Sequence, residues 1–467
     1  MPYEGELADK SSHSQIVRHP DVAEFLTGCQ FLRQPSQAAA DEMSSHFVDW
    51  PVAESELLPP MLIAIDGSWH EGSVDERLLP STRVGYVQIG CVLIDVKQFQ
   101  RLRADKGMVD PFAVAKLEDS NSPLVFPLPS SNVRWGGAFD VREGFRAAVD
   151  QHFYGAATRF RADDPASSLR STLFALAARR EGPLATGDPG VLRLHRCPNG
   201  CPRSDIDVRD VSERQTCPGC GRPVFPTDSV RIWENVEDFQ PNAEGLGRLM
   251  MAVEHLMPIH YMRWILRHSP TALSQTAFFI DGPLAIFGNA AWIHGPILNF
   301  VRDADNRLND LGLPGIVLVG IQKSGVLVDY MNVIGDHVLP NRLLLVDDDY
   351  RYRHVMGSSM RQARIFGSET HYGQDFIYKT ETGRVFVFDL AYPVGDKSTA
   401  GFAAASRDPN LYSSLSRALG LVQRFESDLY ENATIPTVLA HRYTAISLRP
   451  GGQVLDLLTR RALLTEP

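Results

Sequence analysis

Two aspartates in this 467-residue chain share the same local setting. Asp66 follows the apolar run 61–65, Asp281 follows the apolar run 276–280, and a glycine comes directly after each aspartate. Short runs of this kind, rich in β-branched or aromatic residues, predict buried strands. One Asp-Gly pair alone is typical of a turn after a strand. Two matched pairs on adjacent strands could instead share a divalent cation, because carboxylate oxygens suit Mg²⁺ and Mn²⁺.

A third carboxylate, Glu254, lies in the middle of a helix that we predict over residues 244–267. Glu254 is at the edge of the apolar face, where a carboxylate needs a partner, and a metal ion can be that partner. The alternative is an ordinary solvated glutamate. We also expect Pro258 to kink this helix or to end its first half. The apolar face of the helix consists of Leu246, Leu249, Met250, Val253, Leu256 and Met257.

Lys323 and His441 also follow apolar runs, 315–321 and 436–440. A lysine at a strand end can contact a phosphate or offset clustered carboxylates, although it can also simply extend into solvent. Histidine can ligate a transition metal or transfer a proton, although a single histidine after an apolar stretch is often structural. Taken from the residues alone, both roles stay open.

Four of the six cysteines form a compact cluster, in the pattern C-x₃-C, fifteen residues, C-x₂-C. Proline and glycine inside each pair allow tight turns, so both sulfurs of a pair can face one ion. This spacing predicts a four-cysteine Zn²⁺ ribbon, with a structural role or a role in contacting DNA or a partner. A redox dithiol is the alternative, and it fits two paired knuckles less well. The four residues are Cys197, Cys201, Cys217 and Cys220.

Composition sets broad limits on the class of protein. The chain is 44% hydrophobic and 22% charged, which is ordinary for a globular protein. The net charge of −10 does not favour a protein that coats nucleic acid, although a local basic channel is compatible with it. We find no apolar run of 18 residues and no basic, apolar leader, so we expect a cytoplasmic protein without a membrane span.

The order of elements predicts an α/β domain with a mixed sheet, because buried strands alternate with helical segments. We assign 1–58 to an N-terminal helical extension with a short helix near 21–26, and 183–230 to a zinc-ribbon insertion. The segments 59–182 and 231–467 then form the two parts of one domain. The expected strands are 61–65, 84–95, 276–280, 315–321, 342–346 and 384–389, and residues 140–182 are expected to be helical.

In this order, these pieces resemble the NurA nuclease family. The resemblance rests on Asp66-Gly67-Ser68, the helix with Glu254, the segments 279–284 and 319–324, and the C-terminal segment 439–442. It covers roughly residues 60–135 and 240–460. No single motif is specific, and the ordered set carries the similarity.

The resemblance implies an RNase H-like fold and a Mn²⁺- or Mg²⁺-dependent deoxyribonuclease that acts on DNA ends as a 5′–3′ exonuclease, an endonuclease or both. Such nucleases are homodimers that dock on a hexameric HerA-type ATPase, in DNA repair or in defence against foreign DNA. Asp66, Glu254 and Asp281 would be the metal ligands, His441 a further catalytic residue and Lys323 an auxiliary one. A non-catalytic NurA-like adaptor for DNA or for the ATPase is the alternative, and an RNA-cleaving RNase H relative is a third.

The chain departs from the family pattern in two ways. The family usually has a tyrosine about eight residues before the histidine, where this chain has Ala433. Tyr430 and, further upstream, Tyr392 precede this position, but neither has the spacing to the histidine that the family tyrosine has. The zinc-ribbon insertion is not a general feature of the family either, and it could change the substrate, the partner or the regulation.

Overall fold

The computed structural model describes residues 12–29, 35–75, 81–101, 123–357, 366–397, 401–427, 432–446 and 451–464. The chain divides into two compact units, Met1–His46 and Phe47–Pro467. The first unit contains the helices α1 (Ser12–Arg18), α2 (Pro20–Gly28) and α3 (Gln37–Ser44), and α2 confirms the short helix expected near residues 21–26.

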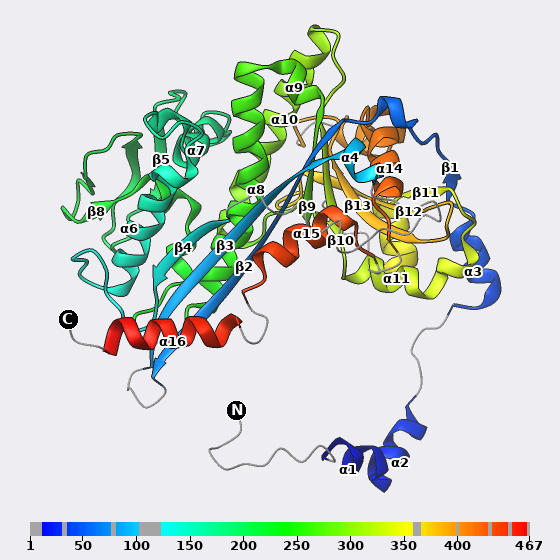
Figure 1. Cartoon of the computed structure of the whole chain (residues 1–467), viewed down its shortest axis with the longest axis horizontal. Helices are drawn as coiled ribbons and strands as arrows, with labels where there is room; N and C mark the ends of the chain where they lie inside the picture. Colours follow the sequence, from blue (N-terminus) through cyan, green and yellow to red (C-terminus); the bar gives the residue numbers. More distant parts are fainter. Residues whose placement is uncertain are drawn as a thin grey trace. The chain divides into compact units, whose positions relative to one another are not determined.

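A large mixed sheet runs through the second unit (Figure 1). Its strand order is β1-β11-β12-β13-β10-β9-β2-β3-β4. The central pairs β10–β9 and β9–β2 are parallel, and all other pairs are antiparallel. All six expected strands are present, so the prediction of a mixed α/β domain is confirmed. The strands are β1 (Val48–Asp49), β2 (Met61–Asp75), β3 (Thr82–Asp95), β4 (Leu124–Pro129), β9 (Thr276–Asp281), β10 (Val317–Gln322), β11 (Arg342–Leu345), β12 (Gly373–Lys379) and β13 (Val385–Ala391).

Helices cover both faces of this sheet, because its central strands are apolar on both sides. In β2, Ile63 and Ile65 belong to one core, while Leu62 and Ala64 belong to the other. On the first face pack α6 (Val141–Tyr154), α7 (Leu169–Ala177), α8 (Ala243–His268) and α10 (His294–Asp310). On the second face pack α4 (Val96–Arg101), α14 (Leu415–Arg424) and α15 (Ile435–Thr444). The remaining α-helices of the described residues are α9 (Pro270–Ser274), α11 (Val326–Ile334), α12 (Asp348–Tyr350), α13 (Phe402–Ser406) and α16 (Gly451–Leu464).

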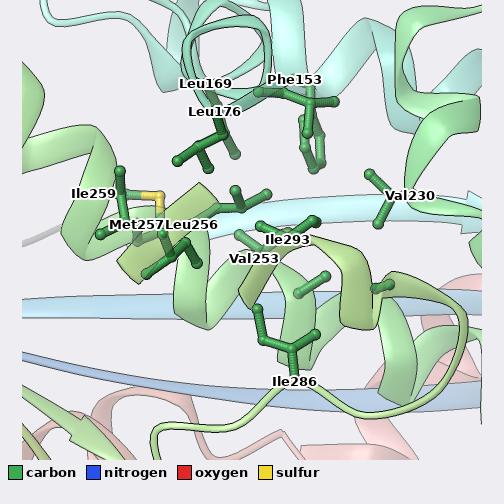
Figure 2. Packing of buried hydrophobic residues seen from close by; sticks show 14 of the residues in the cluster. Phe153, Leu169, Leu176, Val230, Val253, Leu256, Met257, Ile259, Ile286 and Ile293 are labelled. Carbon is green, nitrogen blue, oxygen red and sulfur yellow. The ribbon is translucent and has the colours of Figure 1, made fainter. Parts of the chain in front are cut away.

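The first core is built around α8. Figure 2 shows Val253, Leu256 and Met257 of this helix facing Phe153 of α6 and Leu169 of α7. Burying an aliphatic or aromatic side chain of this size stabilises the fold by about 1.5–3 kcal/mol. Helix α8 continues over 26 residues through Pro258, so this proline does not end its first half, and of the two predicted effects only a kink remains open. The helices α6 and α7 confirm the helical prediction for residues 140–182 over the parts that they occupy.

Strand β2 is much longer than its apolar run predicts. Asp66 was expected to end this strand, but the strand continues to Asp75 because it pairs with β3 along its whole length. What ends near Asp66 is the pairing with β9, whose last matched pair is Ile65 with Ile280. Asp66 therefore lies inside a strand, at the point where one of its two neighbours stops.

Within the described parts of the chain, no helix is both long and apolar enough to cross a membrane.

Candidate metal centres

Asp66, Asp281 and His441 come together at the centre of the sheet. Each of the three offers one ligand atom, and these atoms all lie within 4.8 Å of one another. The strands explain the meeting of the aspartates, since β2 and β9 are parallel neighbours and alternate residues point to the same face. Asp66 thus follows Ala64 on the second face, and Asp281 follows Phe279 on that face. Helix α15, which covers this face, supplies His441.

Asp66 is buried and is held by two donors from α15. Nδ1 of His441 lies 2.8 Å from Oδ2 of Asp66, and the hydroxyl of Thr444 donates to the same oxygen over 3.3 Å. A carboxylate only accepts hydrogen bonds, so Nδ1 of His441 carries the proton and Nε2 stays available as a ligand or a base. The His441 side chain is 56% exposed, so the centre is open to solvent on this side. The other oxygen, Oδ1 of Asp66, accepts no hydrogen bond from the described residues and is available for a cation.

Asp281 is paired with Lys323. The lysine Nζ lies 2.5 Å from Oδ2 of Asp281. Lys323 comes directly after the end of β10, the parallel strand beside β9. Burial raises the pKa of Asp281, with a further contribution from Asp66, and Lys323 opposes this rise. The lysine thus offsets part of the negative charge, as one of its two sequence-based roles predicts. The single positive charge of Lys323 does not neutralise the carboxylates of Asp66, Asp281 and Glu254 together.

Glu254 reaches the same region from the opposite face of the sheet. Beyond Ile65, β9 no longer pairs with β2, and the Glu254 carboxylate approaches the backbone of Gly67 instead, which opposes part of the rise in its pKa. A Cβ atom at position 67 would lie only 2.8 Å from Oε1 of Glu254, so the glycine permits this approach. Burial raises the pKa of Glu254 well above its ordinary value, and Asp66 and Asp281 raise it further. Glu254 is therefore adjacent to the centre, although it is not among the three residues that lie closest together.

Two side chains hold the last turn of α15 on the sheet: Ser68, which the sequence showed only as part of the Asp66-Gly67-Ser68 motif, and Gln88, which it did not single out. Ser68 and Gln88 are cross-strand partners on β2 and β3. The Ser68 hydroxyl donates to the Thr444 carbonyl, and Nε2 of Gln88 donates to the Tyr443 carbonyl over 3.1 Å. We call these two residues the α15 clamp. The sequence did offer one signal for a role of Ser68. It lies two residues after Asp66 on a strand, so both side chains point to the same face of the sheet.

Close packing of α15 on β3 also depends on a glycine. A Cβ atom at Gly90 would lie 2.6 Å from Cγ2 of Thr444. A larger residue at this position would push the helix that carries His441 away from the strands that carry the aspartates.

A second carboxylate cluster lies further along the same sheet. Asp375 of β12 and Asp389 of β13 are cross-strand partners, and Nε2 of Gln322 donates to both, over 2.5 Å and 2.7 Å. Arg351 forms a buried ion pair with Asp375, and the backbone N–H of Leu284 donates to Asp389 over 2.6 Å. Burial and the neighbouring Asp375 raise the pKa of Asp389 well above its ordinary value, so Asp389 shares its proton with Asp375.

No described tyrosine takes the place of the tyrosine that the NurA family usually has about eight residues before its histidine. Ala433 is buried, and Tyr430 lies outside the described residues. Tyr392 is buried beside the second cluster, where burial and the charges of Asp375 and Asp389 raise its pKa.

The four predicted cysteines also converge. Their sulfurs lie within 4.8 Å of one another, with 3.8 Å between Cys197 and Cys220 and 3.6 Å between Cys201 and Cys217. Tetrahedral Zn²⁺ with bonds of about 2.3 Å requires sulfurs separated by about 3.8 Å. The spacing of the sulfurs therefore fits one zinc ion.

Each cysteine pair lies in the turn of a short hairpin. One hairpin is β5 (Val191–Arg196) with β6 (Ser204–Arg209), and the other is β7 (Gln215–Thr216) with β8 (Pro223–Val224). This is the two-knuckle arrangement that the spacing predicts.

The knuckles are joined to the rest of the second unit by Arg146 of α6. This buried arginine pairs with Asp228 over 2.7 Å and donates to Oδ1 of Asn199 in the first knuckle, over 2.9 Å. It also donates to the carbonyl of Pro223, next to the second knuckle, over 2.8 Å. Cys197 and Cys217 belong to the same apolar core as α6 and α8. The cysteine module is thus packed as part of the sheet domain.

Comparison with the models of known protein families finds no match for this chain, and comparison with curated proteins finds none either.

Proposed function

We propose that this chain is a metal-dependent deoxyribonuclease of the NurA type with an RNase H-like fold. The observation that carries the proposal is the meeting of Asp66, Asp281 and His441 within 4.8 Å, at the residues on which the resemblance rests. The sheet supports the fold assignment through the antiparallel meander β2-β3-β4, to which β9 and β10 are added in parallel on the β2 side.

The donor set favours a divalent cation that accepts both oxygen and nitrogen. Asp66 and Asp281 would hold it through carboxylate oxygens, and His441 would approach through Nε2. Mg²⁺ rarely binds imidazole, so the mixture favours Mn²⁺ over Mg²⁺. When bound, such a cation lowers the pKa of water and stabilises charge on a phosphodiester.

The chain's own side chains supply the remaining functions. Glu254, adjacent to Asp66 and Asp281, would add a third carboxylate to the cage once a cation favours its ionised form. Lys323 neutralises charge on Asp281 and can do the same for a phosphate oxygen. The exposed edge of His441 would meet the DNA strand from the solvent side.

The direct test is hydrolysis of linear DNA by the purified protein with Mn²⁺. We expect the wild type to degrade the DNA and both Asp66→Ala and Asp281→Ala to be inactive. Asp163→Ala is a matched control, since Asp163 is exposed and forms only a long 3.9 Å ion pair with Arg161. Equal degradation by the wild type and the two site variants would refute the proposal. Metal-independent DNA binding without cleavage would favour the alternative, a NurA-like adaptor.

The same family resemblance supplies the proposed partners. We infer that the protein acts as a homodimer on a hexameric HerA-type ATPase that feeds DNA to it, in repair or in defence against foreign DNA. Light scattering of the purified protein alone and with such an ATPase would test both associations. A monomer that never binds the ATPase would contradict this part and leave the hydrolysis result standing.

We also propose that the four cysteines bind one structural Zn²⁺. Elemental analysis of the purified protein should give one zinc per chain, and Cys217→Ser should lose it. Protein without zinc would refute this assignment.

A further inference from the structure

A cavity of about 370 Å³ lies on the second unit, and none of the residues of the two metal centres lines it. Its walls come from the residues after α7, from the start of α10 and from the chain on either side of β12 and β13. The lining includes Arg180, Trp292, His294, Asn299, Ser368 and Lys397.

Lys397 is the most unusual group in this cavity. Its ammonium donates to the backbone carbonyls of Ser368, over 3.1 Å, and of His371. Among the described residues it has no carboxylate as an ion-pair partner, and burial lowers its pKa to about 7. A half-buried lysine with only neutral acceptors is costly when charged, so an anion in the cavity would stabilise its charged form.

Arg180 is the second positively charged side chain of the cavity that has no ion-pair partner among the described residues. Its guanidinium lies over the ring of Trp292, 4.3 Å from the ring centre, and makes no ion pair or hydrogen bond with any described residue. Burial lowers its pKa to about 10, and the neighbouring Arg231 contributes. The flat guanidinium therefore keeps all of its N–H donors available for a ligand that enters the cavity.

The other titratable groups at the cavity form no ion pair with Arg180 or Lys397 among the described residues. His294 lines the cavity and His371 adjoins it, and burial lowers the pKa of each to about 4, with a smaller contribution from the charge of Lys397. The carboxylates that line the cavity, Glu181 and Asp396, are exposed at its rim.

We propose that this cavity binds a phosphate group, with Arg180 and Lys397 as its two charged donors. Phosphate oxygens accept charge-assisted hydrogen bonds from both side chains, and arginine can do so with two parallel bonds. The hydroxyl of Ser368 offers a neutral donor in the same cavity, whereas the amide nitrogen of Asn299 already donates to the Glu181 carboxylate over 3.4 Å. The phosphate can come from a free phosphate or nucleotide, or from the backbone of a nucleic-acid strand. The site does not depend on the metal centre or on nuclease activity.

The first test needs only the wild-type protein. A lysine with a pKa near 7 is largely uncharged at pH 8 and reacts readily with an acylating reagent, which mass spectrometry detects at Lys397. We expect inorganic phosphate to slow this modification at least about tenfold, because binding protonates and covers the amine. A chelator is present throughout, so that no phosphate is held through a cation at Asp66 and Asp281. If phosphate leaves the rate at Lys397 unchanged, the proposal is wrong.

The second test uses calorimetric titration with inorganic phosphate. Lys397→Met and Arg180→Gln should each weaken binding by about 10- to 100-fold, as expected for the loss of a charge-assisted hydrogen bond. Arg267→Gln is the control, since it removes the same charge from an exposed position of α8. Equal phosphate affinity in all four proteins would overturn the assignment, even if one variant were less stable.

A final comparison separates the two sources of phosphate. A short single-stranded oligonucleotide that protects Lys397 without metal, and loses this effect in Arg180→Gln, would assign the cavity to a nucleic-acid backbone. Protection by phosphate or a mononucleotide alone would assign it to a small ligand. Protection by none of them would overturn the proposal.

Discussion

The sheet carries two carboxylate clusters that differ in how their charge is balanced. Around Asp375 and Asp389, an arginine, an amide and a shared proton complete the cluster from within. Around Asp66 and Asp281, Lys323 and His441 are present, but Glu254 adds a third carboxylate. One cluster is closed and buried, while the other is open to solvent through His441.

This difference shows how a structural carboxylate can be distinguished from a ligand. Both clusters are buried at the sheet, and both contain a carboxyl group with a strongly raised pKa. A raised pKa therefore does not identify the metal centre by itself. The distinguishing features are an excess of carboxylates over cations and an oxygen of Asp66 that no described donor reaches.

The largest expected effect concerns hydrolysis at the open cluster. Asp281→Asn should reduce Mn²⁺-dependent DNA cleavage by about 10³-fold, because a metal centre supplies several kcal/mol of transition-state stabilisation and about 1.4 kcal/mol is a factor of ten. The metal-free variant should unfold at the wild-type temperature or above, since it loses a buried like charge. If Asp281→Asn cleaved DNA at a rate within tenfold of the wild type, the open cluster would not be the catalytic metal centre.

The closed cluster should respond in the opposite way. Asp375→Asn leaves Arg351 buried without its ion-pair partner, and Nε of Arg351 already has no hydrogen-bond partner among the described residues. We expect the free energy of unfolding to fall by about 3–5 kcal/mol. Mn²⁺ affinity of the folded variant, measured by calorimetry, should match the wild type. A loss of Mn²⁺ affinity at unchanged stability would reverse the roles of the two clusters.

The pH dependence of stability should reveal Glu254. Its pKa in the folded protein lies above the ordinary value of 4.5, so the folded state keeps a proton that the unfolded state has already lost. As pH rises from 4.5 through the raised pKa, the metal-free wild type should lose up to about 1.4 kcal/mol per pH unit relative to Glu254→Gln.

Denaturant unfolding of both proteins across this range measures that difference. Saturating Mn²⁺ should remove it, because a cation stabilises the ionised carboxylates. Parallel curves for the two metal-free proteins would mean that Glu254 is not in the open cluster.

The smallest effect is expected at the α15 clamp. Ser68→Ala removes the bond to the Thr444 carbonyl and loosens the turn that carries His441, so Mn²⁺ affinity should fall by about tenfold. Ser73→Ala on the same strand is the control, because the buried Ser73 hydroxyl has no hydrogen-bond partner in the part of the chain that the structure describes. A larger loss in the control than in Ser68→Ala would show that the clamp does not position the histidine.

The sequence predicted the two aspartates well, because each follows an apolar run that forms a strand wherever it is buried. It did not predict the length of β2. Residues 67–71 have no apolar alternation, and only the pairing with β3 keeps them extended. It also did not predict β12, whose buried Gln374 and Asp375 are satisfied by distant partners.

Long-range contacts also explain why the sequence did not predict the positions or roles of several residues around the site. The sequence placed Glu254 on the edge of an apolar helix face, but could not show that α8 lies on the opposite side of the sheet from His441. Thr444 and Gln88 had no distinguishing pattern at all. Their roles follow from the docking of α15, which depends on residues near the other end of the chain.

The separation of His441 and Asp66 along the chain has a consequence for biosynthesis. A ribosome makes Asp66 early, the cysteine module next, and then Glu254, Asp281 and Lys323. The helix that carries His441 and fastens Asp66 is completed last. If the centre cuts DNA as proposed, a chain still being translated or truncated before α15 lacks one ligand. The order of synthesis would thus delay the nuclease until α15 has been made.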